Sequence, residues 1–355
     1  MQNSFNSHKV SKVSFFKRFK KKILIWLRLT NSAVIKVYNG YGNQQSLVIF
    51  GHVLTLSSLP RKTHRKNFIT NFFSMLRLFI VKPSAGALVK LDWEGIIYET
   101  RSEADGFFRF EWEPYQITKP GKHQVKLSLC NKASIVIAEA AGSIYVPDEH
   151  KYAIISDIDD TFLVSHSSNL RRRLYVLLTK NAHSRKPFEG VVKHYQLLAN
   201  AGVKSGATNP FFYVSSSEWN LYEFLIEFAR NYKMPEGVFL LSQLKNISKI
   251  FASGQGKHSG KFVRIVRIAE AFPTEQLILL GDDSQKDPEI YLSLVEHFPK
   301  RIKCVYIRKR HKKNYAAVKK IVEKIENAGV PCCYFEHSAE AIIDSHQIGL
   351  IVSSS

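Results

Sequence analysis

Three aspartates fall within four positions of the sequence, at Asp157, Asp159 and Asp160, shortly after the apolar run from Ala153 to Ile155. Like charges this close repel one another and raise one another's pKa. A folded chain tolerates such crowding where a cation sits among the carboxylates or where chemistry requires them. This stretch is therefore the first candidate for a functional site.

Polar side chains follow other apolar runs further along the chain. Ser215 and Ser216 follow the run FFYV, and Asp282 follows the run LILL, with Asp287 five residues beyond. Lys261 lies near the start of the helical pattern that precedes LILL. Carboxylates can hold Mg²⁺ together with phosphate oxygens, and a hydroxyl and a lysine can complete a cradle for phosphate. The pattern predicts a metal ion and a phosphoryl group in one site.

Asp157 and Asp159 receive different tasks in this interpretation. Side chains two residues apart on a strand point to the same side, so both can enter one site. Asp157 would attack phosphorus and form an aspartyl-phosphate, and Asp159 would protonate the departing oxygen and later activate water. Asp160 points the other way and is expected to make structural hydrogen bonds.

Strands and helices alternate from Tyr152 onward, which predicts a doubly wound α/β domain with a parallel sheet. In such sheets the site lies beyond the carboxyl ends of the strands. The predicted strands are the runs YAII, FFYV, VFLL, LILL and CVYI. The predicted helices are Glu189–Ala201, Glu218–Tyr232, Gly260–Ala271, Asp287–Phe298 and Lys312–Ala328.

The preceding part of the chain has a period of two instead. In GFFRFEW, HQVKLSL and ALVKLDW, apolar and polar residues alternate, and Asp105-Gly106 and Pro120-Gly121 mark turns. This predicts a small antiparallel, β-sandwich-like domain, with a helix-like stretch from His64 to Ile80. We therefore expect three segments: a basic N-terminal segment at 1–31, the β module at 32–148 and the catalytic domain at 149–355.

The positive charge is concentrated at the N-terminal side. The whole chain carries a net charge of +21, and residues 1–91 contain 16 Lys and Arg but no Asp or Glu. Such asymmetry indicates an anionic partner, either a membrane surface or nucleic acid. Four cysteines without a CxxC pair favour a reducing, intracellular compartment.

Residues 9–29 combine a basic face with an aromatic and aliphatic face at helical spacing, which is typical of an interfacial amphipathic helix. The alternative is a helix that docks on its own protein. The apolar run Ile23–Leu27 is too short to span a bilayer, and no signal-peptide cleavage site follows it. We expect a cytoplasmic protein that associates peripherally with membranes through this segment. The apolar face of the segment makes nucleic acid the less favoured partner.

These motifs, in this order, resemble the haloacid-dehalogenase superfamily of phosphatases, which implies a Rossmann-like catalytic domain. The resemblance implies catalytic roles for Asp157, Asp159 and Lys261 and phosphate contacts from Thr161, Ser215 and Ser216. The metal ligands it implies are Asp157, Asp159, Asp282 and Asp287. Ser216 and Ser217 have a simpler interpretation as caps of the helix that begins near Glu218.

A narrower resemblance involves the stretches FEGVVKHYQLLA, NPFFYVSSSEWNLYEFL, MPEGVFLL, GKHSGKFVRIVRIAEAFP and GDDSQKDPEIY. Over residues 150–345 the chain resembles the actin-patch phosphatidate phosphatase family, including its bacterial members. This implies Mg²⁺-dependent release of phosphate from phosphatidate, a phospholipid, to give diacylglycerol. Asp283 stands where the family has a small residue, and it either adds charge to the metal site or faces solvent.

Two other functions fit parts of the sequence. One is a phosphatase that acts on nucleic-acid ends or on another phosphomonoester, and with nucleic acid the basic N-terminus would bind backbone phosphates. A non-catalytic scaffold for anionic lipids would need none of the carboxylates. The full set of Asp157, Asp159, Ser215, Lys261 and Asp282 argues against such a scaffold.

Overall fold

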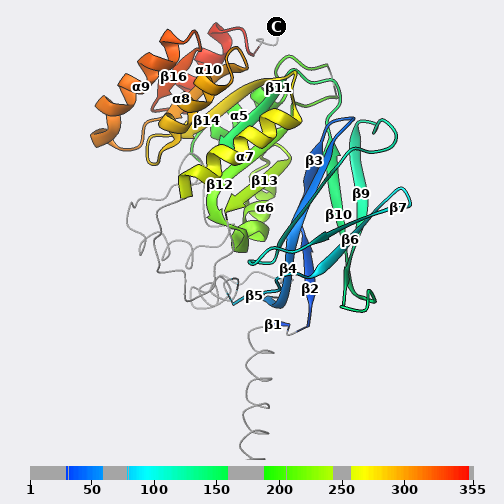
Figure 1. Cartoon of the computed structure of the whole chain (residues 1–355). Helices are drawn as coiled ribbons and strands as arrows, with labels where there is room; N and C mark the ends of the chain where they lie inside the picture. Colours follow the sequence, from blue (N-terminus) through cyan, green and yellow to red (C-terminus); the bar gives the residue numbers. More distant parts are fainter. Residues whose placement is uncertain are drawn as a thin grey trace, which may run out of the picture.

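The computed structural model describes residues 29–30, 32–58, 78, 80–158, 188–204, 206–242 and 257–351. Within these ranges the chain forms a mixed α/β structure with two sheets, one mostly antiparallel and one parallel (Figure 1). Most of the predicted amphipathic helix at 9–29 and of the helix-like stretch at 64–80 lies outside the described residues. Leu29, the last residue of that predicted amphipathic helix, belongs to a strand instead.

The first sheet has ten strands. All of its strand pairs are antiparallel except the parallel pair β3–β10. The strands are β1 Leu29–Thr30, β2 Val34–Val37, β3 Gly40–Gly42, β4 Leu47–Ser58, β5 Lys82–Pro83, β6 Leu88–Trp93, β7 Ile96–Arg101, β8 Phe107–Trp112, β9 Gly121–Cys130 and β10 Val136–Val146.

The alternation seen in the sequence fixes the interior of this sheet. Phe108, Phe110 and Trp112 of β8 are buried, as are the apolar positions of β6 and β9. These side chains share one core with residues of β4 and β10. The predicted period-two pattern is confirmed, because side chains of a strand alternate between a packed face and an exposed one.

The second sheet has six strands in the order β13-β12-β11-β14-β15-β16, and all neighbouring pairs are parallel. The five predicted strands and five predicted helices of this region are confirmed. The strands are β11 Tyr152–Asp157, β12 Phe211–Glu218, β13 Gly237–Ser242, β14 Gln276–Asp282, β15 Ile302–Arg308 and β16 Cys332–Phe335. The helices are α5 Val191–Ala199, α6 Tyr222–Asn231, α7 Lys257–Ala271, α8 Asp287–His297, α9 Tyr315–Asn327 and α10 Ser338–Gln347, with short 3₁₀ turns η2 Trp219–Leu221 and η4 Lys312–Asn314.

Apart from α6, the described helices fall into two contacting groups. α5 contacts α10, whereas α7 contacts α8 and α8 contacts α9. In Figure 1, α7 crosses in front of the parallel strands. None of the helices in the described part of the chain combines the length and the apolarity that crossing a bilayer requires.

Aromatic side chains join the two sheets. Tyr38 stacks on Trp219 with ring centroids 4.2 Å apart, and Tyr41 packs edge-on against Phe212 at 5.2 Å. The backbone N–H of Asn39 donates to the Tyr222 hydroxyl at 2.9 Å. Tyr38 and Tyr41 thus belong to the same core as the parallel sheet. The β module is packed against the site-bearing part of the chain by large buried rings.

Candidate phosphoryl-transfer site

Three predicted site residues meet because their strands are neighbours. Asp157 is the last residue of β11 and lies in register with Val214 of β12, which immediately precedes Ser215. On the other side β11 pairs with β14, which ends at Asp282. Parallel strands carry their carboxyl ends to the same edge of a sheet. The order of the strands therefore brings together residues that are more than 120 positions apart.

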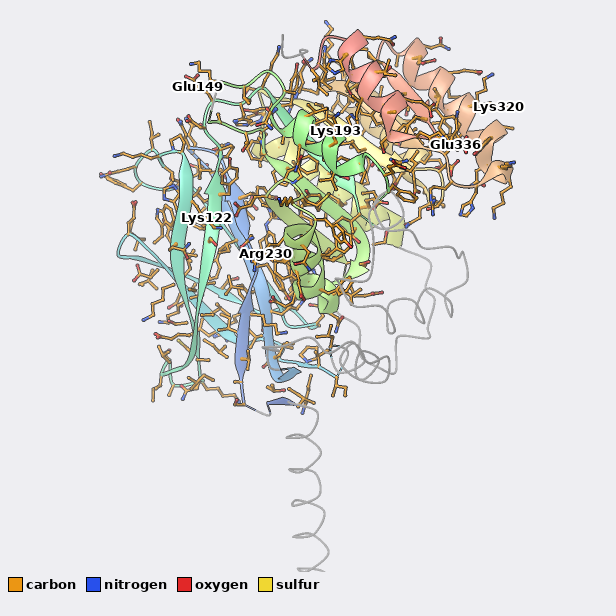
Figure 2. All side chains as sticks on the ribbon, turned by 180° about the vertical axis from the view of Figure 1, so that it is seen from behind. Lys122, Glu149, Lys193, Arg230, Lys320 and Glu336 are labelled. Carbon is orange, nitrogen blue, oxygen red and sulfur yellow. The ribbon has the colours of Figure 1, made fainter. Side chains whose placement is uncertain are left out.

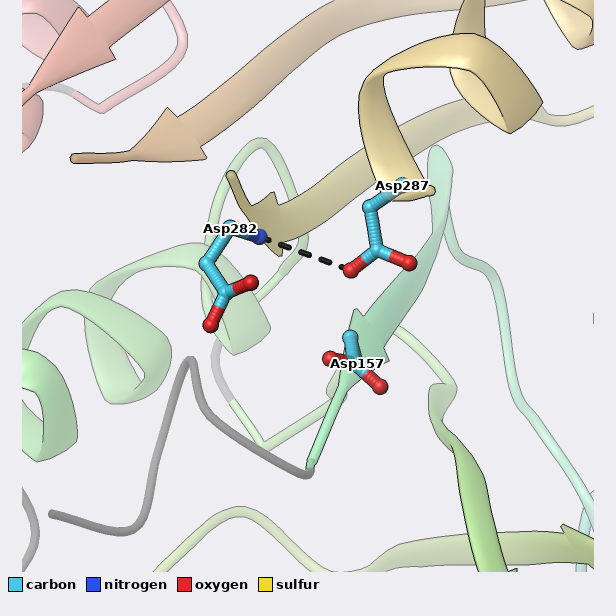
Figure 3. Close-up of side chains that lie close together, drawn as sticks. All are labelled: Asp157, Asp282 and Asp287. Carbon is cyan, nitrogen blue, oxygen red and sulfur yellow. Dashed lines mark hydrogen bonds between the residues drawn. The ribbon is translucent and has the colours of Figure 1, made fainter. Parts of the chain in front are cut away.

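Asp157, Asp282 and Asp287 form a compact group of carboxylates (Figure 3). Each offers an oxygen that lies within 4.8 Å of the others, and all three residues are buried, with exposures of 1% or less. Asp287 begins α8, and its Oδ2 accepts a hydrogen bond from the backbone N–H of Asp282 at 3.4 Å. A carboxylate is also favoured by the positive end of the helix dipole.

Lys261 lies among these acids. Its Nζ pairs with Asp157 Oδ1 at 2.8 Å and with Asp287 Oδ1, and the residue is only 2% exposed. Three carboxylates and one ammonium leave a formal charge of −2 when all are ionised. A divalent cation would neutralise that charge.

Burial raises the pKa of the Asp287 carboxyl, and the nearby charge of Asp282 raises it further, whereas Lys261 lowers it. Desolvation disfavours a charged carboxylate, and a like charge adds to the penalty. The group is thus short of positive charge although it contains a lysine. This is the electrostatic condition under which a metal ion is bound.

Two residues that the sequence analysis did not single out shape the carboxylate group. A Cβ on Gly281 would come within 2.7 Å of Asp287 Oδ2 and 2.6 Å of the Tyr291 hydroxyl, so only glycine leaves room for that carboxylate. Ser284 donates to Asp282 Oδ1 from its backbone N–H at 2.8 Å and from its hydroxyl at 2.7 Å. The spacing of Ser284, two residues after an aspartate, is the signal that could have found it.

Asp283 does neither of the two things expected of it. It is 1% exposed, so it does not face solvent. Its Oδ1 accepts from the backbone N–H groups of Arg310 and His311 at 2.8 and 3.1 Å, and its Oδ2 accepts from the Tyr334 hydroxyl at 2.7 Å. Asp283 therefore ties the segment after β15 to the end of β14, and Asp287 takes the third place in the carboxylate group.

The serines after FFYV remain in the strand. β12 extends to Glu218, which pairs with Ser242, and residue 218 is the N-cap of η2 without a side-chain cap. The interpretation of Ser216 and Ser217 as helix caps is therefore wrong, because the extended backbone continues past them. Ser215 is fully buried, and the Ser216 hydroxyl donates to Gln285 Oε1 at 3.2 Å. Both serines thus line the edge where the carboxylates lie.

Arg264 is a further neighbour that the sequence analysis missed. It follows Lys261 by three residues on α7, and its Nη2 donates to the backbone oxygen of Ser215 at 3.1 Å. This bond ties α7, which carries the buried lysine, to the strand that carries the serines. A helical spacing of three or four from a predicted site lysine is the signal that could have found it.

Asp159, Asp160 and Thr161 lie outside the described residues. Their predicted roles rest on the sequence alone.

Known proteins give an independent comparison. Residues 152–309 match the family model of the phosphatidate phosphatase APP1 catalytic domain. The segment thus resembles a phosphatase-type catalytic domain. More particularly, it is similar to the catalytic domain of the phosphatidate phosphatase APP1 family, the family that the sequence motifs indicated.

The matches to individual relatives cover only part of each relative's length. Phosphatidate phosphatase APP1 of Saccharomyces cerevisiae is 29% identical over 173 residues, which are 48% of this chain and 28% of the yeast protein. An uncharacterized protein of Schizosaccharomyces pombe is 26% identical over 216 residues, 59% of this chain and 34% of its own. The chain thus spans about a third of the length of these curated relatives.

A solved structure, a carbohydrate acetylesterase from Xanthomonas citri, covers 89% of this chain and 74% of its own, with 9% identity and a TM-score of 0.33. A similarity of that size carries no conclusion about fold or function.

Proposed function

We propose that this chain is a Mg²⁺-dependent phosphatase that converts phosphatidate to diacylglycerol through an aspartyl-phosphate on Asp157. The observation that carries the proposal is the buried group of Asp157, Asp282, Asp287 and Lys261 at the carboxyl edge of a parallel sheet. The strand order and the two groups of helices further support a doubly wound, haloacid-dehalogenase-like domain at 149–355, preceded by the β module at 32–148.

The residues fit a magnesium ion. All donors in the group are carboxylate oxygens, which hard cations prefer, and their net charge with Lys261 is −2. Asp157, Asp282 and Asp287 would hold the ion, and Asp159 is the fourth ligand that the sequence suggests. When bound, the ion would neutralise charge on the phosphate so that an anionic nucleophile can approach it.

The chain's own residues divide the chemistry. An oxygen of Asp157 forms a bond to phosphorus while the bond from phosphorus to the glycerol oxygen breaks, and Asp159 gives that oxygen its proton. Water then attacks phosphorus, Asp159 takes the water's proton, and the bond from phosphorus to Asp157 breaks, which frees inorganic phosphate and restores the carboxylate. Lys261 holds Asp157 in line, since its Nζ lies 2.8 Å from Oδ1. The buried Ser215 hydroxyl, at the same edge, would donate to a phosphate oxygen, as Thr161 and Ser216 are proposed to do.

A membrane-bound substrate would also account for the basic N-terminus. The chain before Leu29 contains eight Lys and Arg and no Asp or Glu. Each basic residue near an anionic leaflet contributes about 1 kcal/mol of binding free energy. We propose that residues 1–31 hold the enzyme peripherally on an anionic membrane surface at the cytoplasmic side.

A substrate panel tests this function. Phosphate release is measured with phosphatidate and lysophosphatidate in mixed micelles, with nucleotides and with phosphorylated DNA ends, each with Mg²⁺ and with chelator. We expect the wild type to release phosphate from phosphatidate in a Mg²⁺-dependent reaction, and Asp157→Asn to release none. Preferred hydrolysis of DNA ends would replace the lipid with nucleic acid as substrate, and no hydrolysis of any phosphomonoester would refute the proposal.

A further inference from the structure

The turn between β9 and β10 carries three consecutive exposed aliphatic residues. Ile135, Val136 and Ile137 are 62%, 47% and 50% exposed. The turn that presents them is well defined: Asn131 Oδ1 accepts from the backbone N–H groups of Ala133 and Ile135 at 2.9 and 3.0 Å. The aliphatic side chains are thus held on a hydrogen-bonded hairpin end, which we call the β9–β10 tip (residues 131–137).

The exposure of these side chains departs from the alternation of buried and exposed residues along the other strands of the sheet. Successive side chains of a strand point to opposite faces, so a strand on a core hides one of every two. Leu127 and Leu129 of β9 obey this rule and are buried. At the tip the register between β9 and β10 shifts between Val136 and Ala138, and three neighbouring aliphatic residues are exposed. A contiguous exposed apolar patch of this kind usually marks an interaction site.

The tip lies at the end of the module where the chain enters it. β10 runs parallel to β3, with Ile144 opposite Gly40, and contacts β2, which precedes β3 along the same line. A Cβ on Gly142 would touch Val37 at 2.5 Å, so β2 and β10 run side by side. The first residues of β2 and of β10 are therefore at the same end, and Figure 1 shows β1 and the β9–β10 hairpin together at the bottom.

The tip and the site are connected through the short link between β10 and β11. Only residues 147–151 separate the end of β10 from the start of β11, and Glu149 in this link lies at the top of Figure 2, whereas the hairpin is at the bottom. β11 starts at the link and ends at Asp157. β10, followed backward from the link, leads to the tip, and β11, followed forward from it, leads to Asp157.

The described part of this end carries little net charge. Lys132 lies in the turn itself, and Glu139, the nearest acid on β10, is paired with Lys126 at 2.8 Å. Arg101 lies at the same end, but Glu103 and Asp105 follow it in the connection to β8, so the local balance is close to neutral. The excess positive charge comes from the eight basic residues that precede Leu29 and join the fold here.

We propose that the β9–β10 tip inserts its aliphatic side chains into an anionic lipid bilayer, and so holds the enzyme on a membrane that contains its substrate. The choice of a bilayer as occupant rests on the proposed function, which needs access to a lipid. Aliphatic side chains beside basic ones are the combination that binds the interface of such a membrane.

Vesicle binding of the full chain tests the tip. The probe is a phosphatidylcholine vesicle containing about one fifth phosphatidylserine, and binding is measured by co-sedimentation. The test variant is Ile135→Ser/Ile137→Ser. The matched control is Ile96→Ser/Ile97→Ser, which changes two isoleucines with 43% and 52% exposure in β7, where Ile97 faces Asp92 and lies well away from the tip along the sheet.

We expect the tip variant to bind vesicles at least about tenfold more weakly, because two aliphatic side chains are no longer transferred from water to the bilayer. The control should bind as the wild type does. In Ile135→Trp, quenching by brominated lipids should exceed that of the wild type. Equal binding by the tip variant and the wild type, or an equal loss in the control, would overturn the proposal. So would a wild type that self-associates in light scattering while the tip variant is monomeric and still binds vesicles.

Two measurements separate this proposal from the proposed function. The tip variant should hydrolyse a short-chain phosphatidate, dissolved below its micelle concentration, as fast as the wild type. Asp157→Asn should bind vesicles normally. Normal tip-dependent binding without any hydrolysis by the wild type would refute the phosphatase and leave the membrane contact standing.

Discussion

In the antiparallel sheet the ion pairs lie at the surface. Lys90 pairs with Glu99 and Lys126 with Glu139, with side-chain exposures between 28% and 61%. At the carboxyl edge of the parallel sheet the partners of Lys261 are Asp157 and Asp287, and no side chain of the three is more than 3% exposed. The two sheets therefore place their charges in opposite environments.

Exposed ion pairs contribute little to stability, because water and salt screen them. Buried ions lose several kcal/mol each of hydration, and their attraction often fails to make this up. A stable fold does not require the buried group, as the β module shows with its apolar interior. The contrast indicates that the buried charges at the edge of the parallel sheet are kept for chemistry.

The largest expected effect distinguishes the buried Lys261 from the exposed Lys90. Lys261→Met leaves the buried carboxylates without their cation, so we expect phosphatidate hydrolysis to fall by about a thousandfold or more. In chelator, the free energy of unfolding should fall by about 3–5 kcal/mol. Lys90→Met, at the surface of the other sheet, should leave activity and melting temperature unchanged. Urea unfolding and phosphate release measure both variants, and similar losses in the two would remove the contrast.

A second pair of variants tests whether the carboxylate group binds a metal ion. Gly281→Ala should displace the Asp287 carboxylate, since its Cβ would lie 2.7 Å from Oδ2. We expect about tenfold weaker Mg²⁺ binding and a stability loss of about 1–3 kcal/mol. In Gly260→Ala the new Cβ meets only Arg264 Nη1 at 3.3 Å, and helix propensity should stabilise the chain by up to about 1 kcal/mol.

The readout is the shift of the melting temperature with added Mg²⁺. If Gly281→Ala shows the full shift of the wild type, then Asp287 does not hold the ion.

The smallest expected effect compares one buried histidine from each region. Burial lowers the pKa of His52, beside β8, and of His194, in α5, to about 3. Because the folded pKa lies below the unfolded value near 6.5, the stability from each neutral ring is complete above pH 6.5 and is lost as pH falls toward 3. Between pH 6.5 and 5 each histidine should lower the free energy of unfolding by about 1.6 kcal/mol.

His52→Gln and His194→Gln should each unfold with a shallower dependence on pH, by about 1.4 kcal/mol per pH unit. Urea unfolding at several pH values measures this slope. A slope like that of the wild type in either variant would mean that this histidine is already charged in the folded state.

Local patterns were sufficient to predict most of this architecture. The apolar runs of the parallel sheet and the alternation in β8 and β9 are properties of neighbouring residues, so they could be read from the sequence. β16 and α10 were missed. The strand Cys332–Phe335 has only four residues, three of them half-buried, and such a short run at the edge of a sheet gives little signal.

Contacts between distant residues could not be predicted in the same way. Asp283 receives its hydrogen bonds from residues 27 to 51 positions further along the chain, so the sequence beside it gave no sign of that role. The space that Gly281 leaves for Asp287 likewise depends on how α8 meets β14. In contrast, Asp157, Asp282 and Lys261 could be predicted to meet, because each stands at the end of an apolar strand or the start of a helix.

The most direct test of the central claim is to trap the phosphoryl group on the protein. The enzyme is mixed with phosphatidate and Mg²⁺, quenched rapidly in acid, digested and analysed by mass spectrometry. We predict a phosphoryl adduct on the peptide that contains Asp157, absent in Asp157→Asn and absent when Mg²⁺ is chelated. Turnover of phosphatidate without any such adduct in a quench that captures a known aspartyl-phosphate enzyme, or an adduct on a different residue, would contradict the account.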